Sequence, residues 1–209
     1  MNSIEALNWR YATKVFDKNK RLSSAQSTRL LESLRLSASS FGLQPWKFVV
    51  VEDAAVRQEL LAHSWNQSQV VDASHLIVLC RLAAVDTAYV DRFLQDTAER
   101  RGVPLESLQG YRKMMVGFMK RMDAAARTVW MNNQIYLALG NLLTVCAFEQ
   151  IDACPMEGFS APDYDRILGL ENRNLRSVVL CPVGFRANDD KYAVAPKIRH
   201  PFEDVVITI

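Results

Sequence analysis

The chain has 209 residues, of which 49% are hydrophobic, and its formal net charge is only +2. This length suffices for a sizeable core, so we expect one domain spanning residues 1–209. The near balance of charge gives no reason to expect nucleic acid or an anionic membrane as a partner. No apolar run is long enough to span a membrane and no secretion signal opens the chain, so we expect a cytoplasmic protein.

The four cysteines form no Cys-x-x-Cys pair, and no ligand spacing connects them to the three histidines, His63, His75 and His200. Cys80 and Cys181 lie inside apolar runs that predict strands, where reduced buried thiols are usual. We therefore expect no metal site.

The chain begins with a short predicted helix that Ser3 can cap. The segment that follows carries two basic residues, Arg10 and Lys14, four positions apart. By itself such a pair is most often part of a solvated surface. A Ser-x-x-Gln capping box at Ser23 then predicts a helix that runs to about Leu36.

A loop of small and hydroxylated residues, 37–44, connects this helix to a buried strand predicted at Phe48–Val51. Gly42 and the neighbouring serines leave room for a flat ligand to approach the backbone. Pro45 moves Gln44 out of helical conformation and fixes the start of the strand. The same composition also fits an ordinary helix-to-strand connection.

Asp53 can cap a further helix, and the polar residues 65–75 lead into a strand predicted at Leu76–Leu82. Residues 86–122 have the pattern of two helices interrupted near residues 102–104. Methionine and aromatic side chains form a stripe on the second helix. Such a stripe is more often core than a cofactor-binding surface.

Apolar residues recur at intervals of three and four from Ala126 to Ala147, which predicts a helix of about six turns. Apolar residues also occupy its other faces, so we expect this helix to be buried nearly all round. Gly140 within the stripe permits close approach of a neighbouring element, and a partner subunit is one candidate for that element.

Residues 154–159 have the sequence Cys-Pro-Met-Glu-Gly-Phe. In such a segment we expect backbone N–H groups that take no part in the regular hydrogen bonds of a helix or sheet. Taken alone, this segment is a plain turn before a helix that Ser160 caps and Gly169 ends. The apolar run from Val178 to Gly184 predicts another buried strand.

The C-terminal region carries Lys197 and Arg199 two positions apart in an extended segment, so their side chains point to the same side. The last residues, Val205–Ile209, favour a strand, and such a strand needs a sheet edge with which to pair.

Five of these segments resemble, in their order and spacing, the FMN-dependent nitroreductase family. They are Arg10 to Phe16, Ser39 to Trp46, Asn66 to Ser74, Pro155 to Phe159 and Lys197 to Arg199. Accidental matches to local motifs do not extend in order over a whole chain. The resemblance implies an α+β fold in which helices flank a mainly antiparallel sheet. It also implies an intertwined homodimer in which the C-terminal tail crosses to the other subunit's sheet.

The same resemblance implies an FMN site at the dimer interface, with the amide of Glu157 near flavin N5 and Asn66 at the pyrimidine edge. One subunit would provide Arg10, Lys14, Asn66, Glu157, Lys197 and Arg199, and the other would provide Ser39 and Ser40. Further candidate cofactor-binding residues are Tyr11, Ala12, Ala38, Gly42, Gln69, Pro155, Met156 and Gly158. Residues 86–122 correspond to helices that cover the substrate in the family, so a mobile roof is an alternative to a simple core role.

Four positions depart from the family pattern. Ala12 lacks the usual serine hydroxyl, which puts one hydrogen bond to the phosphate or ribityl group in question. Ala38 and Gly42 stand where many members have proline and asparagine, and Gln69 stands in place of a lysine.

The activity that the resemblance implies is reduction of nitroaromatic, quinone or related acceptors by NAD(P)H. Hydride would pass through the flavin in ping-pong fashion, without a clearly required catalytic side chain. No G-x-G-x-x-G follows a predicted strand, so a Rossmann crevice for the nicotinamide is not expected. Two alternatives remain: a different reaction on the same fold, such as dehalogenation or flavin fragmentation, and a flavin-binding sensor or storage protein.

Overall fold

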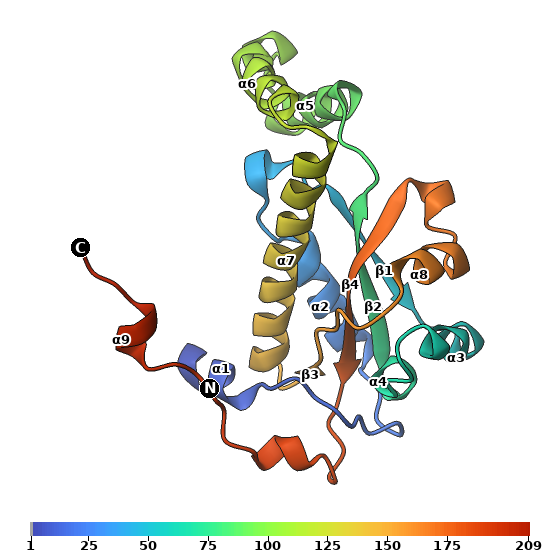
Figure 1. Cartoon of the computed structure of the whole chain (residues 1–209). Coiled ribbons are helices and arrows are strands. Elements are labelled where there is room, and N and C mark those ends of the chain that lie inside the picture. Colours follow the sequence, from blue (N-terminus) through green and yellow to red (C-terminus); the bar gives the residue numbers. More distant parts are fainter. Residues whose placement is uncertain (1) are drawn as a thin grey trace.

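The computed structural model describes residues 2–209, and its centre is a four-stranded antiparallel sheet (Figure 1). The strands, in their order across the sheet, are β1 (Trp46–Val51), β2 (His75–Leu82), β4 (Leu175–Gly184) and the short β3 (Asp152–Ala153). The run Leu76–Cys80 of β2 is buried throughout. This burial accounts for its continuous apolar sequence, because helices cover both faces of the sheet.

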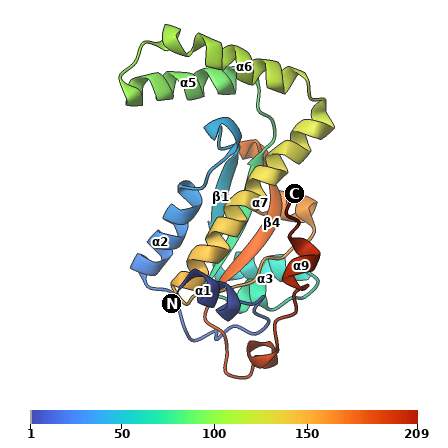
Figure 2. The same cartoon turned by 90° about the vertical axis from the view of Figure 1, so that its left-hand side faces the viewer.

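Two groups of helices cover the sheet (Figures 1 and 2). α2 and α7 pack on one face, where α1 also contacts α7, and α3, α4 and α8 pack on the other face. The α-helices are α1 (Ser3–Trp9), α2 (Ser24–Arg35), α3 (Ala54–Ala62), α4 (Gln69–Asp72), α5 (Thr87–Arg101), α6 (Gln109–Lys120), α7 (Ala124–Phe148), α8 (Ala161–Ile167) and α9 (Phe202–Val205). Short 3-10 turns cover Ser40–Gly42, Leu105–Leu108, Glu171–Arg173 and Lys191–Val194.

Helices α5 and α6 form a hairpin at the N-terminal end of α7, away from the sheet (Figure 2). Leu94, Met115 and Met119 of this hairpin are buried together with Trp130 of α7. The stripe of methionine and aromatic residues is therefore core, as the sequence predicts. No helix among residues 2–209 is long and apolar enough to cross a bilayer.

Capping residues set the starts of α2 and α3 where the sequence predicts them. Gln26 N donates to Ser23 Oγ at 3.3 Å, and Val56 N donates to the Asp53 carboxylate at 2.9 Å. The first helix is an exception, because Asn2 caps it and Ser3 does not. Asn2 forms a reciprocal capping box with the residue three positions on, which satisfies two backbone donors at once.

One further prediction about local structure needs correction. Ser160 precedes α8, but its hydroxyl donates to Asp163 at 2.6 Å and accepts no backbone N–H, so it does not cap the helix through its side chain. Gln44 leaves the right-handed helical region as predicted, with a left-handed φ of 47°.

The long helix α7 extends from Ala124 to Phe148, but it is not buried all round as predicted. Val129 is 58%, Leu137 is 51% and Tyr136 is 41% exposed. One side of the helix packs on the sheet and on α2, and no element of the described chain covers the opposite side. α7 therefore presents an apolar face that one subunit leaves open.

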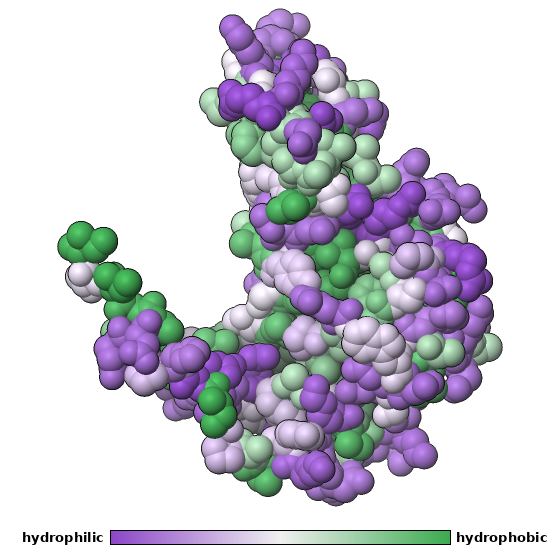
Figure 3. Space-filling model, viewed as in Figure 1, coloured by the Kyte–Doolittle hydropathy of each residue, from purple (hydrophilic) through white to green (hydrophobic). Residues whose placement is uncertain are grey.

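The C-terminal tail projects away from the rest of the molecule (Figures 1 and 3). Phe202–Val205 forms the short helix α9, and residues 206–209 pair with no strand of the described chain. The predicted strand is thus absent from a single subunit. β1 pairs only with β2 among residues 2–209, so one edge of the sheet is also open.

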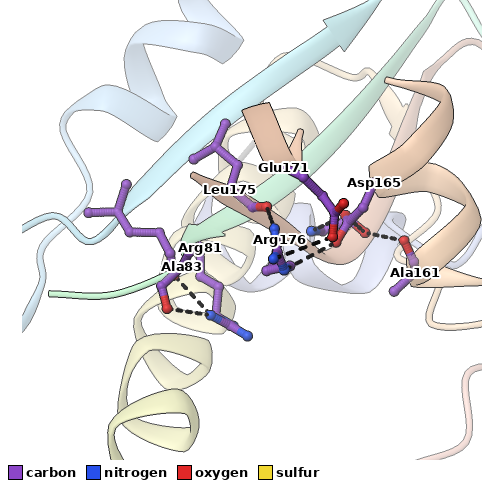
Figure 4. A network of polar contacts seen from close by, with 9 residues as sticks. Arg81, Ala83, Ala161, Asp165, Glu171, Leu175 and Arg176 are labelled. Atoms are coloured by element: carbon purple, nitrogen blue, oxygen red, sulfur yellow. Dashed lines mark hydrogen bonds and ion pairs between the residues drawn. The ribbon is translucent and has the colours of Figure 1, made fainter. Parts of the chain in front are cut away.

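A polar network connects α8 to β4 (Figure 4). Asp165 is only 6% exposed and accepts hydrogen bonds from the backbone N and the hydroxyl of Ser177, at 2.8 and 2.7 Å. The guanidinium of Arg176 is farther away, at 3.8 Å from Asp165 and 3.4 Å from Glu171. The hydrogen bonds to Ser177 are therefore the stronger link between α8 and the sheet.

Asp165→Ala should lower the free energy of unfolding by about 1–3 kcal/mol, because it leaves the buried Ser177 amide without an acceptor. Arg176→Ala, which removes only half-exposed ion pairs, should cost less than about 1 kcal/mol. Urea unfolding of both variants measures the difference. Equal losses would show that the ion pairs hold α8.

Candidate functional site

The segment after α1 and the segment before α9 enclose a pocket of about 400 Å³. Four cationic side chains line it, and none of the described residues that line it is acidic. The cations are Arg10, Lys14, Lys197 and Arg199, and Tyr11 and Ala12 also line the pocket. The structure thus brings together predicted site residues from the two ends of the chain.

Three of the cations in this pocket, Arg10, Lys197 and Arg199, are close enough to repel one another. Lys197 Nζ donates a hydrogen bond to the carbonyl oxygen of Arg10. Partial burial, followed by the charges of Arg10 and Arg199, lowers the pKa of Lys197 below its ordinary value. A bound anion would relieve this repulsion, so the pocket suits a phosphate group.

Residues 10–14, which follow α1, form one wall of the pocket, and we call them the first wall. Asp190, which the sequence analysis missed, holds this wall in place. Its carboxylate accepts from Lys14 N at 2.9 Å, Val15 N at 3.1 Å and the hydroxyl of Tyr11 at 2.8 Å. Burial opposes ionisation of Asp190, but the backbone hydrogen bonds from Val15 and Lys14 keep its pKa below the ordinary value. Burial, followed by the hydrogen bond to Asp190, raises the pKa of Tyr11.

Arg186 braces the same wall from behind. Its guanidinium lies over the rings of Trp9 at 4.2 Å and Tyr11 at 4.5 Å, and its Nε donates to Asp152 at 2.8 Å. Asp152 also accepts from the hydroxyl of Thr13 at 3.2 Å. No spacing in the sequence signals this cluster, because its members are far apart along the chain.

The 155–158 segment lies beside this wall. Ala12 pairs with Ala153, directly before the segment, and Met156 forms an isolated bridge with Leu180 of β4. Glu157 accepts a hydrogen bond from the Tyr136 hydroxyl of α7 at 2.5 Å. Burial and then this hydrogen bond raise the pKa of Tyr136 to about 12. Pro155 to Gly158 are therefore fixed between the sheet and α7.

Trp65 connects the Asn66 segment to Gly158. Trp65 and Asn66 have left-handed φ angles of 54° and 55°, and the Gln67 side chain donates to the carbonyl of Gly158 at 2.9 Å. A Cβ on Gly158 would lie only 2.5 Å from the Trp65 ring, so glycine is required for this contact. Gln69 is buried at the start of α4. Sequence reasoning missed Trp65.

The remaining predicted residues, Ala38, Ser39, Ser40 and Gly42, lie elsewhere in the subunit. Ser40 N donates to Gln134 Oε1 at 2.8 Å, in the middle of α7. The first wall lies beyond the C-terminal end of α7, where Asp152 binds Thr13, and from Gln134 to Phe148 the helix rises about 21 Å. Glu157 contacts α7 nearer to Gln134, at Tyr136, but two residues turn an α-helix by about 200°, so Gln134 and Tyr136 lie on opposite sides of α7. Within one chain, α7 therefore separates Ser40 both from the cationic pocket and from the 155–158 segment.

Comparison with known proteins identifies the family. The sequence model of the nitroreductase family matches residues 7–185. The chain belongs to this family. YfkO of Bacillus subtilis, provisionally named an NAD(P)H nitroreductase, is 37% identical, with 97% of this chain and 95% of the relative covered. A provisionally named NAD(P)H nitroreductase of Staphylococcus aureus is 36% identical, with 97% and 93% covered.

Solved structures of nitroreductases have the same fold. A provisionally named nitroreductase of Exiguobacterium sibiricum, solved in complex with FMN, superimposes with a TM-score of 0.85 at 23% identity and covers 100% of this chain and 98% of its own. YdfN of Bacillus subtilis superimposes with a TM-score of 0.86 at 19% identity, with 99% and 98% covered. The predicted α+β fold with an antiparallel sheet flanked by helices is confirmed.

Gly158→Ala should displace the Trp65 ring, because the added methyl group would overlap it. Trp65 is 74% exposed and can swing outward, so the free energy of unfolding should fall by only about 1 kcal/mol, at the low end for overpacking. Tryptophan emission should change, and Trp65→Phe should abolish the change. Gly110→Ala in α6 is the matched control, since its methyl group meets nothing within 4 Å. Unchanged emission in Gly158→Ala would contradict the contact.

Proposed function

We propose that this nitroreductase-family protein is an FMN-dependent NAD(P)H oxidoreductase that reduces nitroaromatic, quinone or related electrophilic acceptors by ping-pong hydride transfer. The observation that carries the proposal is the pocket in which Arg10, Lys14, Lys197 and Arg199 converge without an acidic residue. The names of the relatives from B. subtilis and S. aureus and the FMN complex of the E. sibiricum protein support it.

The residues that surround the pocket suit FMN. The two arginines can each form paired hydrogen bonds to a phosphate, and the two lysines add charge. Pro155–Gly158 would lie along one face of the flavin, with Asn66 and Gln69 at its pyrimidine edge. When bound, FMN supplies the hydride chemistry at N5. The described side chains bind and orient it, and we assign none of them as a general acid or base.

We also propose that the working protein is a homodimer, because one subunit leaves the site incomplete. Ser40 is bound on the side of α7 opposite Tyr136 and Glu157, and about 21 Å along the helix from the end near the cationic pocket, so this segment does not reach the site of its own chain. The open apolar face of α7 provides a surface on which a second copy can pack. In that dimer Ala38, Ser39, Ser40 and Gly42 of one subunit would complete the FMN site of the other.

Hydride transfer distinguishes this enzyme from a flavin carrier or sensor. NAD(P)H should bleach the yellow protein under anaerobic conditions, and a quinone should restore the colour. In steady state, double-reciprocal plots with NADPH or NADH and a naphthoquinone should be parallel, because donor and acceptor would use one flavin face in turn. Intersecting lines would overturn the shared site, and failure to bleach would favour a carrier.

Arg10→Ala or Arg199→Ala should weaken FMN binding by roughly ten- to more than a hundredfold, since a hydrogen bond to a charged group contributes about 1.5–3 kcal/mol. Riboflavin lacks the phosphate, so its affinity should hardly change. Arg100→Ala, on the exposed side of the hairpin, serves as the control. If the affinities for FMN and riboflavin fall equally, the arginines do not bind the phosphate.

Deleting Val205–Ile209 should dissociate the dimer, lower the melting temperature and loosen FMN, because the tail would pair with the open edge of the other subunit's sheet. In the full-length protein, the double substitution Ile207→Asp and Ile209→Asp should have the same effects. Val194→Asp introduces the same charge at an exposed apolar residue outside the tail and should leave the dimer intact. Light scattering and thermal unfolding measure these effects, and a truncated protein that stays dimeric and equally stable would exclude the cross-subunit strand.

A further inference from the structure

The loop that carries Ser39 and Ser40 has a strained backbone. Phe41, Gly42 and Gln44 have φ angles of 57°, 70° and 47°, so two residues other than glycine adopt the left-handed conformation. A side chain opposes this conformation, and a bulky one such as Phe41 opposes it most. Such a loop keeps its shape only where the surrounding structure holds it. We call residues 39–44 the flavin loop.

Contacts within the flavin loop satisfy the amides of Gly42 and Gln44, whereas two of its carbonyl groups have partners outside the loop. Gly42 N donates to the carbonyl of Ser39 at 2.8 Å, and Gln44 N donates to the hydroxyl of Ser39 at 2.9 Å. The carbonyls of Phe41 and Leu43 accept hydrogen bonds from the α5–α6 hairpin. A partly buried carbonyl without a donor would be costly, so these partners matter for the loop.

Two tyrosine hydroxyls provide these hydrogen bonds. Tyr111 of α6 donates to the carbonyl of Phe41 at 2.8 Å. Tyr89 of α5 donates to the carbonyl of Leu43 at 2.7 Å and to that of Gln44 at 3.1 Å. A tyrosine hydroxyl is protonated at neutral pH, and burial raises the pKa of Tyr89 further.

Aromatic packing strengthens the same connection. The ring of Phe41 lies 5.1 Å from that of Phe118 and 6.2 Å from that of Tyr111, between ring centres. On the other side Ser40 is fixed to Gln134 of α7. The flavin loop is thus held between α7 and the hairpin.

We propose that Tyr89 and Tyr111 are positioning residues through which the α5–α6 hairpin fixes the flavin loop for cofactor binding. The proposal rests on the proposed function, in which Ser39 and Ser40 contact the flavin of the other subunit. A cavity of about 450 Å³ borders Tyr89, Leu43 and Gln44, so the loop has room to relax when the hydroxyls are removed. The hairpin would then act on the flavin through the loop's backbone, without contacting the phosphate.

The test compares Tyr89→Phe, Tyr111→Phe and the double variant in the full-length protein. Affinities for FMN and riboflavin are measured, together with the visible circular dichroism of the bound flavin at saturation. Each single variant should weaken both flavins several-fold, and the double variant about tenfold or more, as expected for lost neutral hydrogen bonds. FMN and riboflavin should be affected equally, because the loop would contact the flat part of the cofactor. The circular dichroism should change as well.

Thr97→Val is the matched control. Its hydroxyl donates to the carbonyl of Phe93 at 2.7 Å within α5, so the substitution removes a hydroxyl from the same hairpin without breaking a hydrogen bond to the flavin loop. Both flavin affinities and the circular dichroism should stay unchanged in this variant. If wild type binds flavin but the tyrosine variants behave like Thr97→Val, the positioning role is wrong and the proposed function stands. A loss restricted to FMN would also overturn it. A wild type that binds neither flavin would overturn the proposed function and this inference with it.

Discussion

Helix α7 is the constraint on which the candidate site depends. It buries one side against the sheet and α2, and at 25 residues it is long enough to separate the flavin loop from the cationic pocket. Because Gln134 holds Ser40 and Tyr136 holds Glu157 on opposite sides of this helix, the two groups of predicted residues do not close on one ligand within a chain. The same helix exposes Val129, Tyr136 and Leu137 on its open side. The separation of the site and the open apolar face are therefore two consequences of one helix, and a second subunit would resolve both.

The positive charge of the cationic pocket is not neutralised by the nearby carboxylates, because these are bound to other groups. Asp152 is paired with Arg186, and Asp190 accepts hydrogen bonds from the backbone of Lys14 and Val15. Both carboxylates are almost fully buried, so they stabilise the wall of the pocket and do not fold outward to neutralise its cations. The fold thus keeps several like charges together, an arrangement that costs stability until an anion binds. Such a cost is typical of a binding site.

Local chemistry made much of this fold predictable from the sequence. The capping box at Ser23, the long apolar repeat of α7 and the apolar runs of β2 and β4 each determine an element by contacts between near neighbours. The site could be predicted only from the resemblance to the family, since no spacing in the sequence indicates that Arg10 and Arg199 line the same pocket. Arg186 and Asp190 were not predicted from the sequence, because their roles depend on contacts with residues that are far away along the chain. The burial predicted for α7 holds only for the side that faces the sheet within one subunit, because apolar periodicity does not distinguish a core from an interface that a partner would cover.

The departures from the family pattern acquire a physical meaning once these contacts are known. The missing hydroxyl at Ala12 does not loosen the segment, because Asp190, Arg186 and the pairing with Ala153 hold its backbone. What is lost is at most one direct hydrogen bond to a ligand. Gln69 is buried, and an amide there avoids the desolvation cost that a lysine would bring. The chain therefore concentrates its positive charge at the proposed phosphate end and keeps the proposed pyrimidine edge neutral. On this distribution the cations contribute mainly to holding the cofactor, and the backbone of the 155–158 segment is left to set the environment of the ring.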